Sequence, residues 1–269
     1  MAPVTRLAIA GATGRMGRVL LAAAGLDARV KVTAVLEHAA SESQGRDAGD
    51  LVASAKGLLI GADLDAALSN ADVLIDFTRP EGTLAHLAAC QRHHVKAVIG
   101  TTGFGDDGKQ LISTYAQSNA IVFAPNMSIG VNVTLKLVEL AAKSLGTFYD
   151  IEVFEAHHKM KIDAPSGTAL KLGEVAAVAR GQRLSEVGVY DRHGVTGARK
   201  QGDIGFSVVR AGDIIGDHTV FFAGAGERIE ITHKSSSREN YAEGALRAAK
   251  FLADKKVGLF DMQHVLGLG

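Results

Sequence analysis

The sequence has little cysteine, tryptophan or proline: one cysteine, no tryptophan and four prolines among 269 residues. A single cysteine, Cys90, excludes an intrachain disulfide, and its apolar neighbours predict a buried position in a helix. Long apolar runs are also lacking. The run Leu7 to Ala12 is too short for the apolar region of a signal peptide, and no segment approaches the roughly 18 apolar residues of a membrane helix. We therefore expect a cytoplasmic protein without a membrane-spanning segment.

The sequence also lacks net charge. Its 29 Lys and Arg residues equal its 29 Asp and Glu residues, whereas a nucleic-acid-binding protein usually carries a basic excess. We therefore expect no nucleic-acid partner. Glycine, in contrast, is abundant at 31 residues, and it is clustered between apolar segments. Glycine at such places allows the backbone to turn tightly or to approach a ligand closely.

The first half alternates short apolar runs with helical patterns, which predicts an α/β fold with a parallel sheet covered by helices on both faces. The expected strands are Leu7–Ala10, Val30–Leu36, Ala71–Phe77, Val95–Ile99 and Ile121–Ala124. The expected helices are Arg15–Ala24, Pro80–His93 and a segment that is capped by Asp106 or Asp107 and runs to about Ser118.

The pattern changes after Asn126, and the second half predicts a separate α+β domain. Its expected antiparallel strands, exposed to water on one face, are Gly205–Arg210, His218–Phe222 and Glu227–His233. The other expected elements are a strand over Ile151–Glu155, helices over Val131–Leu145, Ser166–Arg180 and Arg238–Ala253, a loop over Arg183–Gln201 and a short apolar tail over Leu259–Leu266. The pattern leaves open which domain holds the last helix.

The first motif is Gly11-Ala12-Thr13-Gly14-Arg15-Met16-Gly17, which follows a predicted strand and opens a predicted helix. This is the context of a dinucleotide-binding turn. Gly11 permits the tight turn, Gly14 lets the backbone approach a pyrophosphate, and Gly17 lets the helix pack on the strand. Free N–H groups at the start of the helix then face the phosphates. Alone, such a glycine triplet also fits an ordinary strand-to-helix turn.

Glu37 supplies a second feature of a dinucleotide site, because it directly follows the second predicted strand. A carboxylate there accepts hydrogen bonds from the ribose hydroxyls of adenosine, although a solvated loop glutamate would look the same. It also repels a 2′-phosphate, which favours NADH. Arg15 and His38 lie nearby and soften that repulsion, so the use of NADH, NADPH or both stays open.

Three further segments follow predicted strands of the first half: Asp76-Phe77-Thr78, Gly100-Thr101-Thr102-Gly103 and Ala124-Pro125-Asn126-Met127. Ligands of open α/β sheets bind beyond the carboxyl ends of the strands. Each segment alone is more simply an ordinary loop. After a dinucleotide turn, the three together are expected to meet the nicotinamide half of the cofactor.

The third motif runs from Glu155 to Thr168 and reads Glu-Ala-His-His-Lys-Met-Lys-Ile-Asp-Ala-Pro-Ser-Gly-Thr. Ser166 is a natural helix cap, and the N–H groups of Gly167 and Thr168 form an anion site at the start of that helix. Lys161 can supply a proton or a positive charge, and His157 can do acid–base chemistry near neutral pH. The set predicts an anionic substrate, most simply a carboxylate.

Other interpretations of this motif are a metal site and a polar loop. A pair of histidines can bind a metal, but no third and fourth ligand stands at metal spacing, so no metal is expected. A nucleophilic mechanism is disfavoured, because the sequence has no Gly-x-Ser-x-Gly elbow and Cys90 is expected to be buried.

These residues resemble the 4-hydroxy-tetrahydrodipicolinate reductase family, also called the dihydrodipicolinate reductase family. The matching stretches run along the whole chain, and the Glu155–Thr168 motif is far more specific than the glycine turn. They are Gly11–Gly17, Asp76–Gly82, Gly100–Phe104, Glu155–Thr168, Arg210–Gly212, Glu227–Lys234 and Gly258–Met262.

The resemblance implies NAD(P)H-dependent reduction of a cyclic dicarboxylate, 4-hydroxy-tetrahydrodipicolinate, to tetrahydrodipicolinate on the diaminopimelate route to lysine. It also implies a Rossmann-like dinucleotide-binding domain of residues 1–127 and 238–269. A central α+β domain, residues 128–237, then binds the substrate and forms a homotetramer.

The resemblance further assigns roles by matching position. His157 matches an acid–base histidine and Lys161 a proton donor, while His158, Ser166, Gly167 and Thr168 match the substrate-binding segment. The matching cofactor contacts are Gly11, Ala12, Thr13, Gly14, Arg15, Met16, Glu37, His38, Phe77, Gly100, Thr101, Thr102, Ala124, Pro125, Asn126 and Met127.

Two residues depart from the family pattern. Thr13 stands where some members have glycine, which a small residue tolerates. His38 stands where some members have an arginine that would meet a 2′-phosphate, and this weakens the case for a strong NADPH preference.

Two other functions remain to be separated by experiment. A non-catalytic sensor that binds NAD(P)H would not need the His157 and Lys161 set. A reductase of another small carboxylate, such as a semialdehyde or homoserine dehydrogenase, would share the glycine turn. An acylating semialdehyde dehydrogenase would also need a reactive cysteine, and Cys90 is expected inside a helix.

Overall fold

The computed structural model describes residues 3–268, which form two compact units. One unit comprises residues 3–129 and 238–268, and the other comprises residues 130–237. Each unit has its own sheet and its own hydrophobic core. None of the helices in residues 3–268 combines the length and apolarity that crossing a membrane requires.

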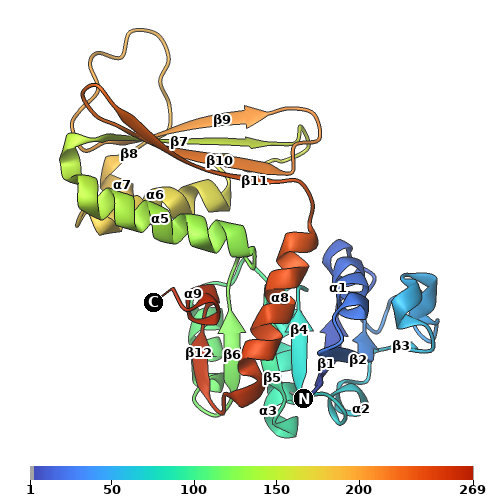
Figure 1. The fold of residues 1–269 in the computed structure, drawn as a ribbon. Coiled ribbons are helices and arrows are strands. Elements are labelled where there is room, and N and C mark those ends of the chain that lie inside the picture. Colours follow the sequence, from blue (N-terminus) through green and yellow to red (C-terminus); the bar gives the residue numbers. More distant parts are fainter. Residues whose placement is uncertain (1–2, 269) are drawn as a thin grey trace. The chain divides into compact units, whose positions relative to one another are not determined.

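The first unit contains a seven-stranded sheet in which all pairings are parallel, in the order β3-β2-β1-β4-β5-β6-β12 (Figure 1). Apart from the added β12, this is the strand order of the Rossmann fold. The strands are β1 (Thr5–Ala10), β2 (Val30–Leu36), β3 (Ile60–Gly61), β4 (Val73–Asp76), β5 (Lys96–Ile99), β6 (Ala120–Phe123) and β12 (Gly258–Phe260). The predicted α/β class is confirmed.

Both faces of this sheet are covered by helices, which explains why most of its strand residues on both faces are apolar, and not only those at alternate positions. In β1, Leu7 and Ile9 pack towards α1 and α8, and Ala8 and Ala10 pack towards α2 and α3. The helices are α1 (Arg15–Leu26), α2 (Leu64–Leu68), α3 (Pro80–His93), α4 (Asp106–Tyr115), α8 (Glu239–Phe251) and α9 (Met262–Leu266), with short 3₁₀ turns at Ala48–Asp50, Ala53–Ala55 and Leu252–Asp254.

The second unit has a five-stranded mixed sheet in the order β11-β10-β7-β9-β8, with α5 and α6 packed on one face (Figure 1). The core between them is built from apolar side chains at alternate strand positions, such as Ile151 and Val153. The elements are α5 (Ile129–Leu145), a 3₁₀ turn (Gly146–Phe148), β7 (Asp150–His157), α6 (Gly167–Ala179), α7 (Leu184–Val187), β8 (Gly188–Val189), β9 (Ile204–Arg210), β10 (Gly216–Ala223) and β11 (Arg228–Ser235).

Four expectations need correction. The strand expected over Gly205–Arg210, β9, is not antiparallel to its neighbours but parallel to both β7 and β8, because a strand pattern does not show the direction of pairing. The expected loop Arg183–Gln201 contains α7 and β8, and the expected tail Leu259–Leu266 contains most of β12 and all of α9. The N-cap of α4 is Gly105, so Asp106 lies in the first helical turn, and the helix ends at Tyr115.

Candidate functional site

The glycine turn lies between β1 and α1, where the sequence places it. Gly11 has a φ of 68°, which is in the left-handed region that favours glycine. A Cβ on Gly17 would stand 2.3 Å from the carbonyl oxygen of Gly11, so the start of α1 can pack on the turn only without a side chain there. Gly14 is the N-cap residue of α1 and has no side chain to cap it. The first N–H groups of α1 are therefore left for an anionic ligand.

Glu37 lies just after β2 and is bonded to this turn. Its Oε2 accepts hydrogen bonds from the backbone N–H of Thr13 at 3.1 Å and from Thr13 Oγ1 at 2.6 Å, and its Oε1 accepts one from the N–H of His38 at 2.9 Å. Burial alone would raise the pKa of Glu37, but these hydrogen bonds outweigh burial and hold the pKa below its ordinary value. The carboxylate is therefore ionised and fixed beside the turn.

A cavity of about 870 Å³ opens beside Glu37 and the turn. Six of the residues predicted to bind the cofactor line it, and Arg79, Glu81 and His86 line it although they were not predicted. The six are Gly11, Thr13, Gly14, Glu37, His38 and Phe77. The predicted residues outside its lining are Ala12, Arg15, Met16, Gly100, Thr101, Thr102, Ala124, Pro125, Asn126 and Met127.

Of the residues outside the lining, Gly100 contacts a side chain of the cavity wall, and Thr101 is buried next to it in the sequence. A Cβ on Gly100 would stand 2.1 Å from the ring of Phe77, so this glycine makes room for a ring that lines the cavity. Thr101 is buried and accepts a hydrogen bond from Thr83 Oγ1 at 2.9 Å. Their place at the carboxyl end of β5 was predicted. Whether either touches a cofactor stays a prediction.

The buried carboxylate of Asp76 joins several of these segments, and its pairing with a histidine was not predicted. Its Oδ2 lies 2.7 Å from Nδ1 of His86 on α3, and its Oδ1 accepts from the N–H and Oγ1 of Thr78 at 2.8 and 2.7 Å. Burial would raise the pKa of Asp76, but the contact with His86 and the donors of Thr78 outweigh it, so the pKa is lowered. A carboxylate at a strand end, ten residues before a helical histidine, is the signal that could have found this pair.

In the second unit, the motif Glu155–Thr168 begins at the last three residues of β7, where the strand leaves the hydrophobic core. Side chains two apart on a strand share a face, so Glu155 and His157 continue the face of Ile151 and Val153 to the strand end. The neighbouring strands bring two more polar side chains alongside: in the register of the sheet, Arg210 on β9 is opposite His157, and His218 on β10 is opposite Glu155. The motif thus becomes a polar cluster at one end of the core.

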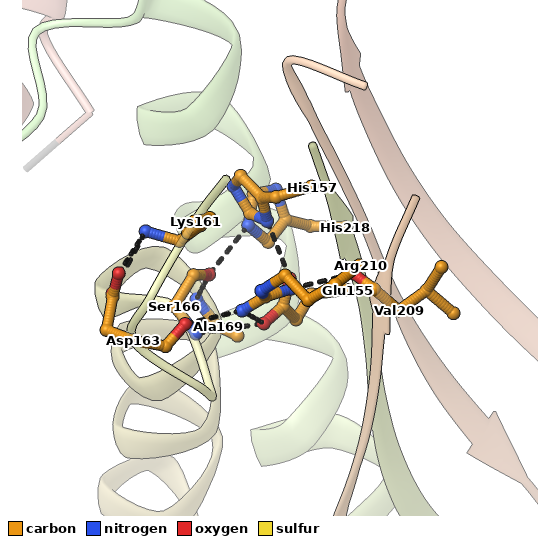
Figure 2. A network of polar contacts seen from close by, with 9 residues as sticks. All are labelled: Glu155, His157, Lys161, Asp163, Ser166, Ala169, Val209, Arg210 and His218. Carbon is orange, nitrogen blue, oxygen red and sulfur yellow. Dashed lines mark hydrogen bonds and ion pairs between the residues drawn. The ribbon is translucent and has the colours of Figure 1, made fainter. Parts of the chain in front are cut away.

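The start of α6 completes the cluster, as Figure 2 shows. Ser166 is the N-cap residue, as predicted, and its Oγ accepts from the N–H of Ala169 at 3.2 Å. Its hydroxyl also lies 3.1 Å from Nε2 of His218. Ser166 is 2% exposed, and its hydroxyl group makes both of these contacts inside the protein. Direct contact between this side chain and a substrate stays a prediction.

Glu155 is the fully buried centre of the cluster (Figure 2). Arg210 donates to both of its oxygens, at 2.7 and 2.8 Å; the N–H of Ser166 donates at 3.0 Å, and Nδ1 of His157 lies at 2.6 Å. Burial would raise the pKa of Glu155, but the hydrogen bonds from Arg210, His157 and Ser166 outweigh it and lower the pKa. The pairing of Glu155 with Arg210 was not predicted, because 55 residues separate them in the sequence.

His218 is also buried, with its ring centre 5.1 Å from that of His157. Burial lowers the pKa of His218 to about 4, and the charge that His157 can carry adds to the effect. Lys161 lies at the open side of the cluster, where its Nζ donates to both oxygens of Asp163 at 2.7 and 2.9 Å. The cluster therefore combines a neutral buried imidazole, an ionised carboxylate and a cation that remains partly exposed.

Within residues 3–268, no group of three or more His, Cys, Asp or Glu side chains is arranged to hold a metal ion. Cys90 is fully buried in α3, and burial raises the pKa of its thiol, which makes it a poor nucleophile. The chemistry that remains is proton transfer and anion binding in the second unit and, in the first, a turn suited to a dinucleotide. Together these features fit the class of dinucleotide-dependent oxidoreductases.

Comparison with known proteins identifies the family. The model of the dihydrodipicolinate reductase N-terminus matches residues 5–127, and that of its C-terminus matches residues 130–266. A 4-hydroxy-tetrahydrodipicolinate reductase of Herminiimonas arsenicoxydans is 59% identical over 98% of both chains, and one of Cupriavidus pinatubonensis is 61% identical over 97% of this chain and 99% of that one. The chain therefore belongs to the dihydrodipicolinate reductase family.

A solved structure supports this assignment. The dipicolinate-bound dihydrodipicolinate reductase from Paenisporosarcina sp. TG-14 is 26% identical, with a TM-score of 0.77 over 96% of this chain and 97% of that one. The agreement therefore extends over both units.

Proposed function

We propose that this chain reduces 4-hydroxy-tetrahydrodipicolinate to tetrahydrodipicolinate with NADH or NADPH, a step on the diaminopimelate route to lysine. The observation that carries this proposal is the match to relatives that are named for this activity. Each match covers nearly the whole of this chain and of the relative. The polar cluster at the end of β7 agrees with the proposal, because it offers cations, N–H donors and a histidine to a small dicarboxylate.

The first unit is proposed as the dinucleotide-binding domain, and its residues fit such a cofactor. The turn with Gly11 in the left-handed region brings backbone close to a pyrophosphate, and the uncapped start of α1 offers N–H groups to it. When bound, a reduced nicotinamide supplies the hydride. Glu37 is expected to accept from the ribose hydroxyls of adenosine in exchange for its present contacts with Thr13.

The second unit is proposed to bind the substrate and to supply the proton. Loss of the 4-hydroxyl group as water leaves a conjugated imine. Hydride addition to this imine builds electron density on the substrate, and a proton must neutralise it. Lys161 is the proposed donor of that proton, and His157 is the proposed acid–base group. His158 and the N–H groups of Gly167 and Thr168 are proposed to bind substrate carboxylates, with Ser166 as the cap of α6. The relative from Paenisporosarcina binds dipicolinate, also a dicarboxylate, which supports this assignment.

Glu37 and His38 bear on the choice between the two cofactors. The ionised carboxylate of Glu37 favours a free ribose hydroxyl over a 2′-phosphate. His38 also lines the cavity, and its Nδ1 accepts from the N–H of Ala40 at 3.2 Å, which leaves Nε2 as the position for a proton. We propose that NADH is used well and that NADPH is accepted.

We further propose a cytoplasmic homotetramer that assembles through the second unit. Among the described residues of that unit, α5 and α6 pack on one face of the sheet, and the opposite face carries Phe154, Phe221 and Val209. Light scattering should give a mass near four times the chain mass of 28.1 kDa. A mass of one chain would contradict this assembly.

The test of the function is a coupled assay. Pyruvate and aspartate semialdehyde are condensed in situ by the preceding synthase, and the loss of reduced-nicotinamide absorbance is followed with NADH and with NADPH. Substrate-dependent oxidation confirms the reductase. Binding of NADH without oxidation would favour a sensor, and oxidation with homoserine-type substrates alone would favour another small-carboxylate reductase.

A further inference from the structure

Burying the ionised carboxylate of Glu155 costs free energy of folding. It is fully buried, and a buried ionised group must be compensated by hydrogen bonds. Glu155 has four such contacts, two with Arg210, one with the N–H of Ser166 and one with His157. It therefore joins β7, β9 and the start of α6, and it touches the proposed acid–base histidine directly.

The chemistry of the partners fixes the direction of every hydrogen bond. The guanidinium of Arg210 and the backbone N–H of Ser166 can only donate, so they hold Glu155 as an ionised acceptor. An ionised carboxylate has no proton to give, so Nδ1 of His157, at 2.6 Å, must be the donor. In a neutral imidazole the proton on Nδ1 leaves Nε2 with a free lone pair.

Gly216 on β10 provides an independent observation on the other side of the ring. A Cβ on Gly216 would stand 3.1 Å from Nε2 of His157, so a larger residue there would crowd this nitrogen. His157 retains a partly exposed side chain. The nitrogen that Glu155 leaves without a proton is thus also the nitrogen that faces Gly216, where no side chain crowds it.

We propose that Glu155, held by Arg210, is a positioning residue that fixes His157 in the tautomer with Nε2 free to accept a proton; this inference rests on the proposed function. The groups that face His157 are Glu155 on its own strand, Arg210 on β9 and His218 on β10. Arg210 balances the charge of Glu155 and holds its carboxylate in place. The imidazole of His157 therefore donates to an acceptor whose position is fixed.

The variant Glu155→Gln tests this role, because it keeps the shape of the side chain while its amide can donate a hydrogen bond to Nδ1. The proton of His157 should then move to Nε2. Turnover should fall about 10²–10³-fold, which lies within the range of about 10²–10⁴-fold for a lost acid–base group, with a smaller change in KM and a Kd for NADH within about twofold of wild type. Glu155→Asp keeps a carboxylate and should recover part of the turnover.

The matched control is Glu152→Gln on the same strand. Glu152 also accepts from an arginine, Arg192, with both distances 2.8 Å, but it is half-buried and does not touch His157. This control should keep wild-type turnover and the wild-type tautomer. The tautomer is determined by long-range ¹H–¹⁵N correlation of the histidine rings in the full chain, with the signals of His157 assigned from their loss in His157→Asn.

The wild-type spectrum decides the proposal even if Glu155→Gln fails to fold. A proton on Nδ1 of His157 supports the proposal, and a proton on Nε2 overturns it. A folded Glu155→Gln variant that keeps its turnover, or that loses turnover with the proton still on Nδ1, also overturns it. If the wild-type chain oxidises neither cofactor with substrate, the proposed function fails instead, and the spectrum still reports the tautomer.

Discussion

The carboxylate of Asp76 at the end of β4 accepts a hydrogen bond from Nδ1 of His86 on α3, across 2.7 Å. Asp76 is 1% exposed, and His86 lines the cavity beside the glycine turn. The pair therefore links the buried end of a strand to the wall of the proposed cofactor site, and it can be tested apart from the chemistry of the second unit.

Replacing Asp76 with Asn should destabilise the first unit and weaken cofactor binding. The amide cannot accept from both Thr78 and His86 as the ionised carboxylate does, and leaving a buried hydrogen-bonding group unsatisfied costs about 1–3 kcal/mol. Urea unfolding and NADH titration measure the two effects. Asp72→Asn is the control, because its pair with Arg6 is exposed and should matter much less. Equal losses in the two variants would contradict this role of Asp76.

The stability of the chain should fall in mild acid because of His218. The folded chain protonates this ring only near pH 4, whereas an unfolded histidine does so near 6.5. Between these values the unfolded state binds more protons, so stability decreases as the pH falls through this window. From pH 7 to 4.5, wild type should lose about 2 kcal/mol more than His218→Gln. Urea midpoints at both pH values measure the difference, and parallel losses would exclude His218 as the cause.

Replacing Glu37 with Gln should shift the choice of cofactor. The neutral amide accepts more weakly from the ribose hydroxyls, which should raise the KM for NADH about tenfold. It also no longer repels a 2′-phosphate, so the NADPH-to-NADH ratio of kcat/KM should rise. Glu42→Gln, an exposed glutamate on the loop that follows, serves as control. An unchanged ratio would exclude Glu37 as the residue that discriminates between the cofactors.

Replacing Lys161 with Ala should lower turnover by about 10²–10⁴-fold while the Kd for NADH stays constant, because a proton donor acts in the chemical step. Lys159→Ala changes the same residue type two positions earlier, where the side chain is exposed, and should have little effect. Stopped-flow turnover and fluorescence titration of NADH measure the two quantities. Wild-type turnover in Lys161→Ala would rule out the proposed role.

The architecture of the first unit was predictable because its turn and most of its strands are indicated by residues that lie close together in the sequence. Gly11, Gly14 and Gly17 have a spacing that only a few turns satisfy, and buried strands stand out as short apolar runs. β12 was missed, since three residues have no periodicity of their own. Its place is set by pairing with β6, in which Leu259 lies opposite Ile121, 138 residues earlier in the chain.

The second unit shows the limit of sequence patterns. The sequence indicates a strand over Gly205–Arg210, but its local residues do not show that β7 lies between β9 and β10. The same pairing creates the cluster. Arg210 reaches Glu155 because β7 and β9 run parallel in one register, so the contact became visible only with the fold.

The central claim is that this chain transfers a hydride from a nicotinamide to a cyclic dicarboxylate. Mass spectrometry of the product, formed in the coupled assay with NADH deuterated at both C4 positions, tests this claim most directly. We predict one non-exchangeable deuterium on a ring carbon of tetrahydrodipicolinate. An unlabelled product, or oxidation of the cofactor without substrate, would contradict the claim.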